Sequence, residues 1–326
     1  MLDVIFRRFL VMITMLLMVS VVSFFIIELP PGDYLDAYVS NVLASGGEVT
    51  PELEAAMRAS YGLDDPTYVR YLRWMNRLSH GDMGRSMELQ QTVLTLIAQR
   101  LPYSVAISLF SLCLIYLISF PVGLYIAAKQ YSIADYTVSV VAFVGVGIPP
   151  FLFALACLWI IYVATGKAAL GLFSPEFQFA PWSLPKVLDL GKHLLLPAFI
   201  TAFTSTAATI RILRANLLDE LEKPYVMVAR AKGMPEWRML IKYPLRFAIN
   251  PIVSTIGWVL PALFGGELLT SMVLGLPTIA PMFVKAIIYQ DMYLAAGIVL
   301  ILSCLTIVGT FLSDVLLVLL DPRIRA

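Results

Sequence analysis

Charged residues are scarce in this chain, and their scarcity excludes most soluble folds. Only 14% of the 326 residues are Asp, Glu, Lys or Arg, whereas a soluble domain carries about 25%. The mean hydropathy is +0.84, and the net charge of +1 indicates no surface for nucleic acid. Composition therefore predicts a protein that lies in a lipid bilayer and does not bind nucleic acid.

Cysteine and histidine are nearly absent. The cysteines, Cys113, Cys157 and Cys304, all fall inside apolar stretches, which favours small buried side chains over a disulfide or a metal site. The two histidines, His80 and His193, are far apart and have no companion at ligand spacing. The sequence therefore predicts neither a metal centre nor a cofactor bound by this chain.

A nucleotide-binding loop is also missing. The Gly-Lys pairs at Gly166 and Gly191 are not followed by Ser or Thr, so neither forms a phosphate-binding P-loop. The chain is therefore not expected to hydrolyse ATP by itself. An intramembrane protease would need a Ser/His pair, paired Asp residues or a metal site, and the acids in the apolar stretches are isolated. We expect a protein that is not an enzyme.

Long apolar stretches are what the chain does have. A transmembrane helix needs roughly 20 apolar residues, and the candidates are Phe9–Ile27, Leu101–Ala128, Tyr136–Gly166, Leu194–Ile210, Phe247–Gly266 and Met292–Ser313. These stretches predict an all-α integral membrane protein with about six transmembrane helices. The proline pair Pro149-Pro150 is predicted to kink or break the third stretch.

A further apolar segment, 268–284, is cut by Gly275, Pro277 and Pro281. A full crossing there would be poorly formed, because glycine and proline interrupt the helical hydrogen bonds. A broken, partly re-entrant segment that lines a cavity suits these residues better.

Basic residues predict the orientation. With the N-terminus inside, 13 basic residues lie on the cytoplasmic side and 4 in the short outside loops, in line with the positive-inside rule. Both termini are therefore predicted to be cytoplasmic. The chain then divides into 1–28 (N-terminal tip and first helix), 29–100 (an external helical subdomain) and 101–326 (a core with five transmembrane helices).

The external subdomain carries two helix patterns. In the first, Thr50 is placed to cap the helix and Pro51 to start it. In the second, apolar residues recur at helical spacing opposite three arginines, and these apolar residues are Tyr68, Leu72, Met75 and Leu78. Gly81 is a plausible helix end. The subdomain is suited to docking a soluble partner or to covering a translocation path.

The segment 211–246 is the longest polar stretch on the predicted cytoplasmic side. Pro224 and Gly233 interrupt its helical pattern, and a second short helix is expected from Pro235 onward, so the segment reads as helix, glycine turn, helix. The apolar residues expected to share one face of the first part are Leu213, Leu217, Leu221 and Val228.

Two interpretations of this basic segment stay open. It could be a loop that binds anionic lipid headgroups, or a short helix held in a groove of a soluble partner. The small residues Ala229, Ala231 and Gly233 favour the second interpretation, because they would let another protein approach closely.

Four stretches in order along the chain resemble one family. "YVMVARAKGMPEWRMLIKYPLRFAINP" (225–251) resembles the coupling-helix motif of binding-protein-dependent ABC transporter permeases, and is closest to their oligopeptide/dipeptide-type branch. "GLDDPTYVRYLRWMNRLSHGDMGRSM" (62–87) resembles the external signature of that branch, "LIAQRLPYSVAISL" (96–109) the entry to its second helix, and "LLDPRIR" (319–325) its C-terminal ending. The resemblance covers nearly the whole chain.

The resemblance implies an importer subunit of the bacterial inner membrane. Its implied partners are a homologous second permease subunit, two ABC ATPase subunits that use ATP and Mg, an external solute-binding protein and the lipid bilayer. The residues implied to couple to the ATPases are Tyr225, Ala229, Arg230, Ala231, Lys232, Gly233, Glu236 and Lys242. The implied cargo is a di- or oligopeptide. The alternatives are the same architecture with an oligosaccharide or another small solute, or a non-ABC channel or transporter.

Few residues are candidates for the translocation path. Glu267 and Asp314 are the ionisable residues of the apolar stretches to consider first, because charges at membrane depth are costly. Glu267 fits a gate or path position as well as a structural hydrogen bond, and Asp314 fits a structural role. Pro149, Pro150 and Pro277 could shape the cavity or only kink the packing.

Overall fold

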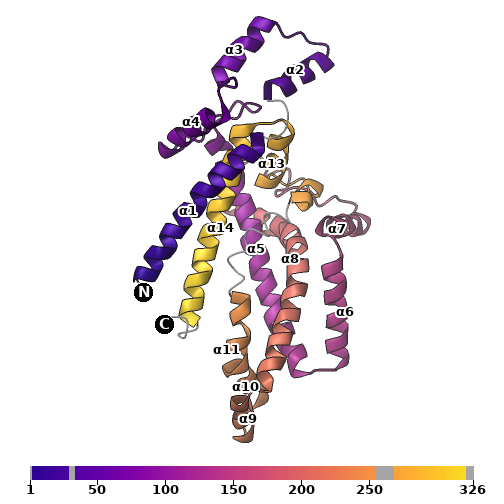
Figure 1. Ribbon diagram of the computed structural model, residues 1–326. Helices are drawn as coiled ribbons and strands as arrows, with labels where there is room; N and C mark the ends of the chain where they lie inside the picture. Colours follow the sequence, from indigo (N-terminus) through magenta and orange to yellow (C-terminus); the bar gives the residue numbers. More distant parts are fainter. Residues whose placement is uncertain (1, 29–33, 254–267, 321–326) are drawn as a thin grey trace. The chain divides into compact units, whose positions relative to one another are not determined.

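The computed structural model describes residues 2–28, 34–253 and 268–320, and the elements within them are helical (Figure 1). The chain divides into two compact units, one of residues 1–102 with 278–307 and one of 103–277 with 308–326. No strand occurs in the described ranges, which contain a single isolated bridge between Arg85 and Thr92. The prediction of an all-α membrane protein is confirmed.

The helices have the following bounds. The first unit contains α1 (Leu2–Glu28), α2 (Tyr34–Ala44), α3 (Pro51–Tyr61), α4 (Thr67–Ser79) and α13 (Ile279–Ile288). The second contains α6 (Ile133–Gly147), α7 (Pro150–Thr165), α8 (Leu184–Leu221), α9 (Pro224–Ala231), α10 (Glu236–Lys242) and α11 (Pro244–Ala248). Two long helices, α5 (Val93–Ala128) and α14 (Met292–Leu320), have residues in both units.

Three of the described helices are long and apolar enough to cross a membrane: α5, α8 and the part Met292–Phe311 of α14. The apolar part of α1, Leu10–Phe25, is shorter. Most of the predicted span Phe247–Gly266 lies outside the described residues. Six crossings therefore remain a prediction, although several membrane helices are present.

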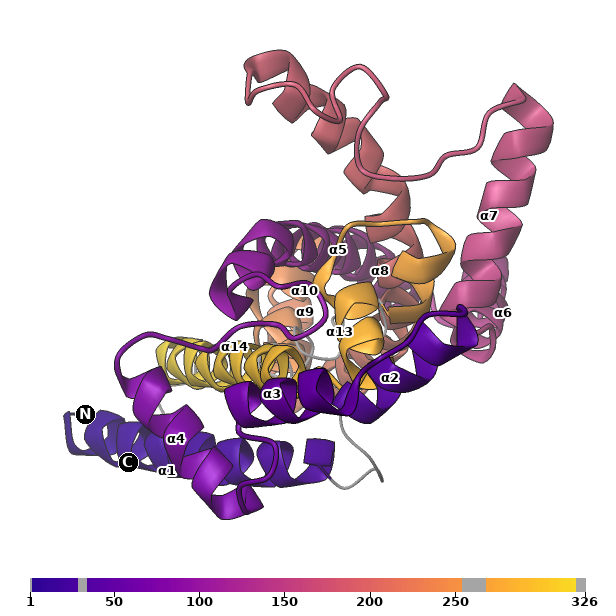
Figure 2. The ribbon, with the colours of Figure 1, turned by 90° about the horizontal axis from the view of Figure 1, so that it is seen from above.

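The proline pair breaks the third predicted span, as its sequence indicated. Pro149 caps α7 and Pro150 occupies its first turn, while Ile148 leaves the helical conformation at the end of α6. The axes of α6 and α7 differ by 107°. Figure 1 shows α6 lengthwise and Figure 2 shows α7 lengthwise, so the two helices do not form one straight span.

Helix α8 is much longer than its predicted apolar core. It has 38 residues, roughly 57 Å at 1.5 Å per residue, whereas a bilayer's hydrocarbon core is about 30 Å thick. Its ends therefore extend beyond the lipid, and its C-terminal end leads directly into the basic segment.

Helices α5 and α8 pack side by side and run in the same direction. The Ser111 hydroxyl donates to the Ala198 carbonyl at 3.1 Å, and the Ser119 hydroxyl donates to the Thr206 carbonyl at 3.3 Å. Both bonds join residues 87 positions apart, which requires parallel helices in constant register. Buried serines in apolar helices commonly hold neighbours together in this way.

One glycine sets the spacing of these two helices near their basic ends. A Cβ atom at Gly123 would lie 2.8 Å from Cδ2 and 3.2 Å from Cγ of Leu213, whose side chain is fully buried. Since Leu213 belongs to the apolar cluster between the helices, it has little room to move.

Replacing Gly123 by Val is therefore expected to lower the unfolding free energy by about 1–3 kcal/mol, the usual cost of overpacking a core. Gly191→Val on α8 is the matched control, because nothing lies within 4 Å of its added Cβ. A denaturant titration of the purified chain measures both. Equal destabilisation of the two variants would contradict the close α5–α8 contact.

The first unit confirms the predicted helix caps. The Thr50 hydroxyl accepts from the Leu53 amide at 3.3 Å, Pro51 starts α3, and Gly62 ends it with φ = 64°. Gly81, with φ = 80°, follows the end of α4 as predicted.

The helix predicted around Tyr68–Leu78 is present as α4, but only part of its apolar stripe is covered. Trp74 is the buried residue, and Tyr71, Met75 and Leu78 pack around it, whereas Tyr68 and Leu72 are both 61% exposed. The aromatic ring of Phe24 on α1 stacks on Trp74 at 5.5 Å, so the direction of α1 decides which face of α4 is covered.

The prediction of buried cysteines was also partly wrong. All three thiols are free, but Cys113 on α5 is exposed, and Cys157 and Cys304 are half-buried. Each lies on an apolar helix, where lipid or another subunit can cover the side chain without burial inside the chain itself.

Candidate functional site

The basic segment after α8 forms a chain of short helices, and its prolines decide where each begins. Lys223 is extended (φ −69°, ψ 144°), as residues before proline usually are, and Pro224 starts α9. Pro235 is the N-cap of α10, whereas the sequence predicted it as the first helical residue. Pro244 starts α11. The predicted order of helix, glycine turn and helix is confirmed (Figure 1).

Gly233 makes the turn between α9 and α10. Its φ is +69°, in the left-handed region that glycine adopts without a Cβ penalty. Its amide donates to the Arg230 carbonyl at 3.0 Å, and the Met234 amide donates to the Ala229 carbonyl at 3.3 Å. These two bonds form a Schellman motif, which satisfies the carbonyls at the end of α9.

The inner face of this segment is apolar and attaches it to the membrane helices. Val226 and Ala229 of α9 and Met239 and Leu240 of α10 are buried in one cluster. Leu124 of α5 and Leu221 of α8 pack against that cluster. Because both short helices share a core with the ends of two long helices, the segment and these ends should move together.

Polar contacts reinforce this attachment. The Tyr225 hydroxyl donates to the Glu220 carboxylate, and its ring lies 6.4 Å from that of Tyr243 and 5.8 Å from that of Phe247. Burial and the Glu220 carboxylate raise the pKa of Tyr225 well above its ordinary value, so this hydroxyl remains a donor at neutral pH. The Asn216 side chain donates to the carbonyl of Ala248 at 3.2 Å, which ties α11 to α8.

The outer face of the segment is exposed and carries most of its charges. Ala231, Lys232, Gly233, Glu236 and Lys242 are exposed. Arg230 and Glu236 form an ion pair at 2.8 Å across the glycine turn. Both side chains are more than half exposed, and such pairs contribute at most about 1 kcal/mol. Ala229 is the exception among the small residues, because it is buried against α10.

Sequence reasoning missed an apolar component of this outer face. Met227, Val228, Trp237 and Ile241 are each between 52% and 61% exposed. The prediction that Val228 shares a face with Leu213 and Leu217 was wrong, since those two are buried and Val228 is exposed. The break at Pro224 starts a new helix, α9, in which Val226 faces inward instead. The available signal was the run of four apolar residues in five positions, Trp237, Met239, Leu240 and Ile241, because one face of a helix cannot bury all of them. The outer face is thus both apolar and basic, as suits a protein partner.

The predicted path residues are only partly described. Glu267 and the side chain of Asp314 lie outside the described residues. Pro277 follows the chain reversal at Gly275, whose φ is +63°. The break in segment 268–284 is confirmed there, because helix α13 begins only after Thr278.

Two of these candidate regions meet in one apolar cluster of the second unit. Leu274 and Leu276, just before Pro277, are buried in this cluster with Ala154 of α7 and Leu194 of α8. The Gly171 amide also donates to the Leu274 carbonyl at 2.9 Å. The helix begun by the Pro149-Pro150 pair and the residues before Pro277 therefore contribute to the same cluster.

These features define a class: a multi-pass helical membrane component whose basic helix–turn–helix segment is fastened to its membrane helices. Comparison with known families agrees, since residues 119–326 match the binding-protein-dependent transport system inner membrane component and residues 1–108 match the N-terminal component of the same systems. The chain belongs to this family of inner membrane transport permeases.

Individual relatives show to which branch of the permease family the chain belongs. The chain is 33% identical to the oligopeptide transport system permease protein AppB of Bacillus subtilis, over 98% of each chain. It is 32% identical to a putative peptide permease protein of Brucella ovis, again over 98% of each chain. It is 29% identical to the inner membrane ABC transporter permease protein YejB of Escherichia coli O157:H7, over 98% of this chain and 97% of that one. The chain is an ABC permease of the oligopeptide/dipeptide-type branch.

Proposed function

We propose that this chain is the transmembrane permease subunit of an ATP-driven importer for di- or oligopeptides, and that it forms half of the translocation path. The peptide cargo is supported by relatives named as peptide permeases that align over nearly the whole chain. The coupling role rests on one observation: α9 and α10 share a buried cluster with the ends of α5 and α8.

The mechanism follows from that attachment. Separate ATPase subunits bind the exposed face of α9 and α10. Tyr225, Ala229 and Glu236 hold the shape of the segment through their contacts within the chain. The residues at or near the binding surface are Arg230, Ala231, Lys232, Gly233 and Lys242. When the ATPases bind and hydrolyse ATP with Mg, they displace this segment. Because its core includes residues of α5 and α8, the displacement moves those helices as a body and switches access between the two sides of the membrane.

The proposed assembly has further parts that this chain does not supply. A homologous second permease completes the path, two ATPase subunits provide the energy, and an external solute-binding protein delivers the cargo. Both termini and the segment 211–246 lie in the cytoplasm, because this orientation places 13 basic residues inside. Pro149, Pro150, Pro277 and Glu267 remain candidates for the path or its gate.

A reconstituted importer tests the proposal. Proteoliposomes that contain this chain, its partner permease, the two ATPases and the binding protein are expected to accumulate a labelled tripeptide only when ATP is present. The isolated chain is expected to hydrolyse no ATP. Uptake of an oligosaccharide with no uptake of any peptide would contradict the cargo, and ATP turnover by the isolated chain would contradict the division of labour.

Orientation has its own test. A membrane-impermeant amine reagent applied to intact cells is expected to leave Lys232 and Lys242 unlabelled and to label them after the membrane is opened. Labelling of either lysine from outside would place the coupling segment on the wrong side of the membrane.

A further inference from the structure

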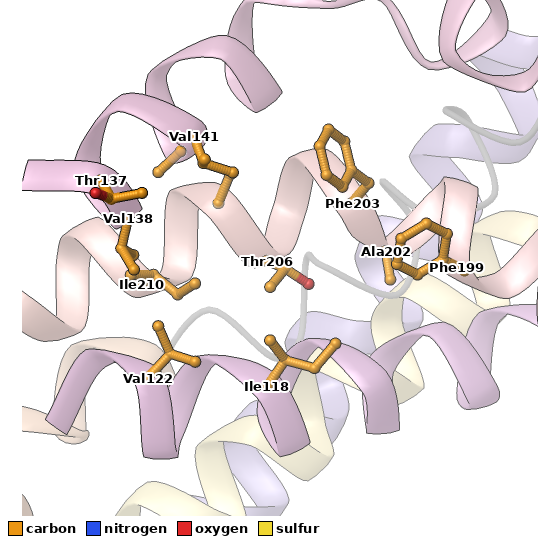
Figure 3. Close-up of a pocket in the computed structure, with 12 residues that line it drawn as sticks. Ile118, Val122, Thr137, Val138, Val141, Phe199, Ala202, Phe203, Thr206 and Ile210 are labelled. Atoms are coloured by element: carbon orange, nitrogen blue, oxygen red, sulfur yellow. The ribbon is translucent and has the colours of Figure 1, made fainter. Parts of the chain in front are cut away.

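The second unit has an open apolar groove of about 260 Å³ beside α8, between α5 and α6 (Figure 3). Its lining is almost entirely hydrocarbon, so acyl chains and an apolar helix of another subunit would cover it equally well. An exposed apolar face of α4, in the first unit, is different, because the contacts between α4 and α1 fix the depth at which that face lies.

Helix α4 has an exposed apolar face and a basic face. Tyr68 and Leu72, one turn apart, form the apolar face, whereas Trp74 is buried in the core of the unit. An apolar face on one side and arginines on the other are typical of helices that lie in the surface of a bilayer. The charged residues of α4 are all basic: Arg70, Arg73 and Arg77.

The contacts with α1 show at which level α4 lies. Figure 2 shows α4 crossing α1, and the buried ring of Phe24 on α1 stacks on Trp74 at 5.5 Å. Phe24 lies four residues, or about 6 Å of helix, before Glu28, the first charged residue after Arg8. The crossing therefore lies just inside the end of the charge-free stretch 9–27. Interfacial helices lie at this depth, with their apolar faces buried about 5–10 Å into the boundary between headgroups and acyl chains.

A hydrogen bond between the two helices shows which side of α4 reaches deeper. The hydroxyl oxygens of Tyr71 and Ser20 lie 3.0 Å apart. Ser20 is one turn of α1 closer than Phe24 to the middle of the charge-free stretch. The side of α4 that carries Tyr71 therefore points further toward the bilayer interior than the side that carries Trp74.

The exposed apolar residues lie on this deeper side. At 100° per residue, Tyr71 is about 60° around the helix from Trp74, and Tyr68 and Leu72 follow at about 120° and 160° in the same sense. Arg77 lies about 60° from Trp74 in the opposite sense, and is exposed. The apolar face thus points toward the acyl chains, and Arg77 points toward water.

The neighbouring surface of α1 is open to lipid at the same level. Val22 and Phe25, on either side of Phe24 in the sequence, are exposed. The described part of the chain therefore does not enclose α1 beside its contact with α4. A soluble partner would have to enter the acyl-chain region to reach Tyr68 and Leu72 there, whereas lipid is already present at that depth.

We propose that α4 is an interfacial helix, with its Tyr68–Leu72 face among the acyl chains and its Arg77 side at the lipid phosphates. The leaflet is the one that the C-terminal end of α1 reaches, which is the outer leaflet if the N-terminus is cytoplasmic. This placement rests on α1 lying in the bilayer, and not on the importer function. It makes α4 an anchor that holds the first unit against the membrane surface.

Spin labels test where the two sides of α4 lie. The full chain, with its three cysteines replaced by serine, carries a nitroxide at Leu72→Cys or, as the matched control, at Arg77→Cys, and is reconstituted in phosphatidylcholine vesicles containing phosphatidylglycerol. Oxygen concentrates in hydrocarbon, whereas a nickel chelate stays in water. The ratio of oxygen to nickel collisions is therefore expected to be roughly tenfold higher at Leu72 than at Arg77.

Three results would overturn the proposal. Equal nickel collisions at both positions would place the Leu72 side in water, where a soluble partner could bind it. A Leu72 label closed to both reagents would show that protein covers this face. A third label, at Val22→Cys, tests the premise, since frequent nickel collisions there would show that α1 does not lie in the bilayer at this level.

Hydrogen exchange measures whether lipid contact stabilises α4. Leu72→Asn is expected to speed exchange of the α4 amides in vesicles roughly tenfold, because the apolar contact with lipid is lost. Arg77→Asn is the control and is expected to change exchange by less than about twofold. Equal effects of the two variants would refute a lipid-facing Leu72. Neither measurement depends on uptake or ATPase activity, so failure of the proposed importer function would leave both outcomes intact.

Discussion

Gly233→Trp is expected to reduce ATP-driven uptake by at least roughly tenfold while the protein still inserts into the membrane. Tryptophan at φ = +69° is strained by about 1–2 kcal/mol, since a left-handed residue brings Cβ against the next carbonyl. The turn between α9 and α10 would open, and the indole would project from the exposed face next to Ala231 and Lys232. A partner groove that accepts a glycine there would be blocked.

Two controls separate this effect from general damage. Gly166→Trp places the same residue at an exposed glycine with φ = +68° at the end of α7, far along the chain from the coupling segment. It should lower stability similarly but leave ATPase attachment intact. Gly233→Asn should retain most uptake, because asparagine tolerates the left-handed region. Uptake and co-purification of the ATPases are the measurements, and normal values of both in Gly233→Trp would remove the coupling role from this turn.

Arg214→Met is expected to destabilise the second unit by about 3 kcal/mol. The Arg214 guanidinium binds both carboxylate oxygens of Asp135, at 2.6 and 2.7 Å, and thereby joins the start of α6 to α8. The Asp135 side chain is only 3% exposed, so removal of the arginine leaves a buried charge without its partner. Breaking such a pair from one side costs about 3–5 kcal/mol, and the lower value applies because Arg214 itself is 26% exposed.

A double-mutant cycle identifies the cause. Asp135→Leu combined with Arg214→Met should be less destabilised than the sum of the two single variants, because neither charge is then left alone. Arg230→Met is the control, since its pair with Glu236 is exposed and should cost under about 1 kcal/mol. Unfolding of the purified chain in increasing denaturant gives all four values. Strict additivity of the two single changes would refute a direct coupling between α6 and α8.

The basic segment 211–246 has two possible partners by its sequence, and its structure favours one of them. Its sequence left open whether it binds lipid headgroups or a protein. In the structure the outer face combines basic side chains with exposed Trp237 and Ile241, while Met239 and Leu240 face the cluster that holds Leu124 and Leu221. A segment held on its inner side and apolar on its outer side fits a protein partner better than a loop lying on headgroups.

The sequence alone determined the membrane class, the family resemblance and those helix ends that carry a capping residue, a proline or a glycine. Thr50, Pro150, Pro224 and Gly233 stand at helix boundaries in the structure because capping, proline geometry and positive φ are properties of a few consecutive residues. Such signals require no knowledge of what lies elsewhere in the chain.

Only the tertiary structure decided which sides of the helices are covered. The exposure of Tyr68 depends on where α1 lies, the pairing of Asp135 with Arg214 joins residues 79 positions apart, and the groove beside Thr206 is built from three helices. A uniformly apolar helix has no periodic pattern that distinguishes its lipid face from its packed face, so its neighbours can be known only once the helices are placed together.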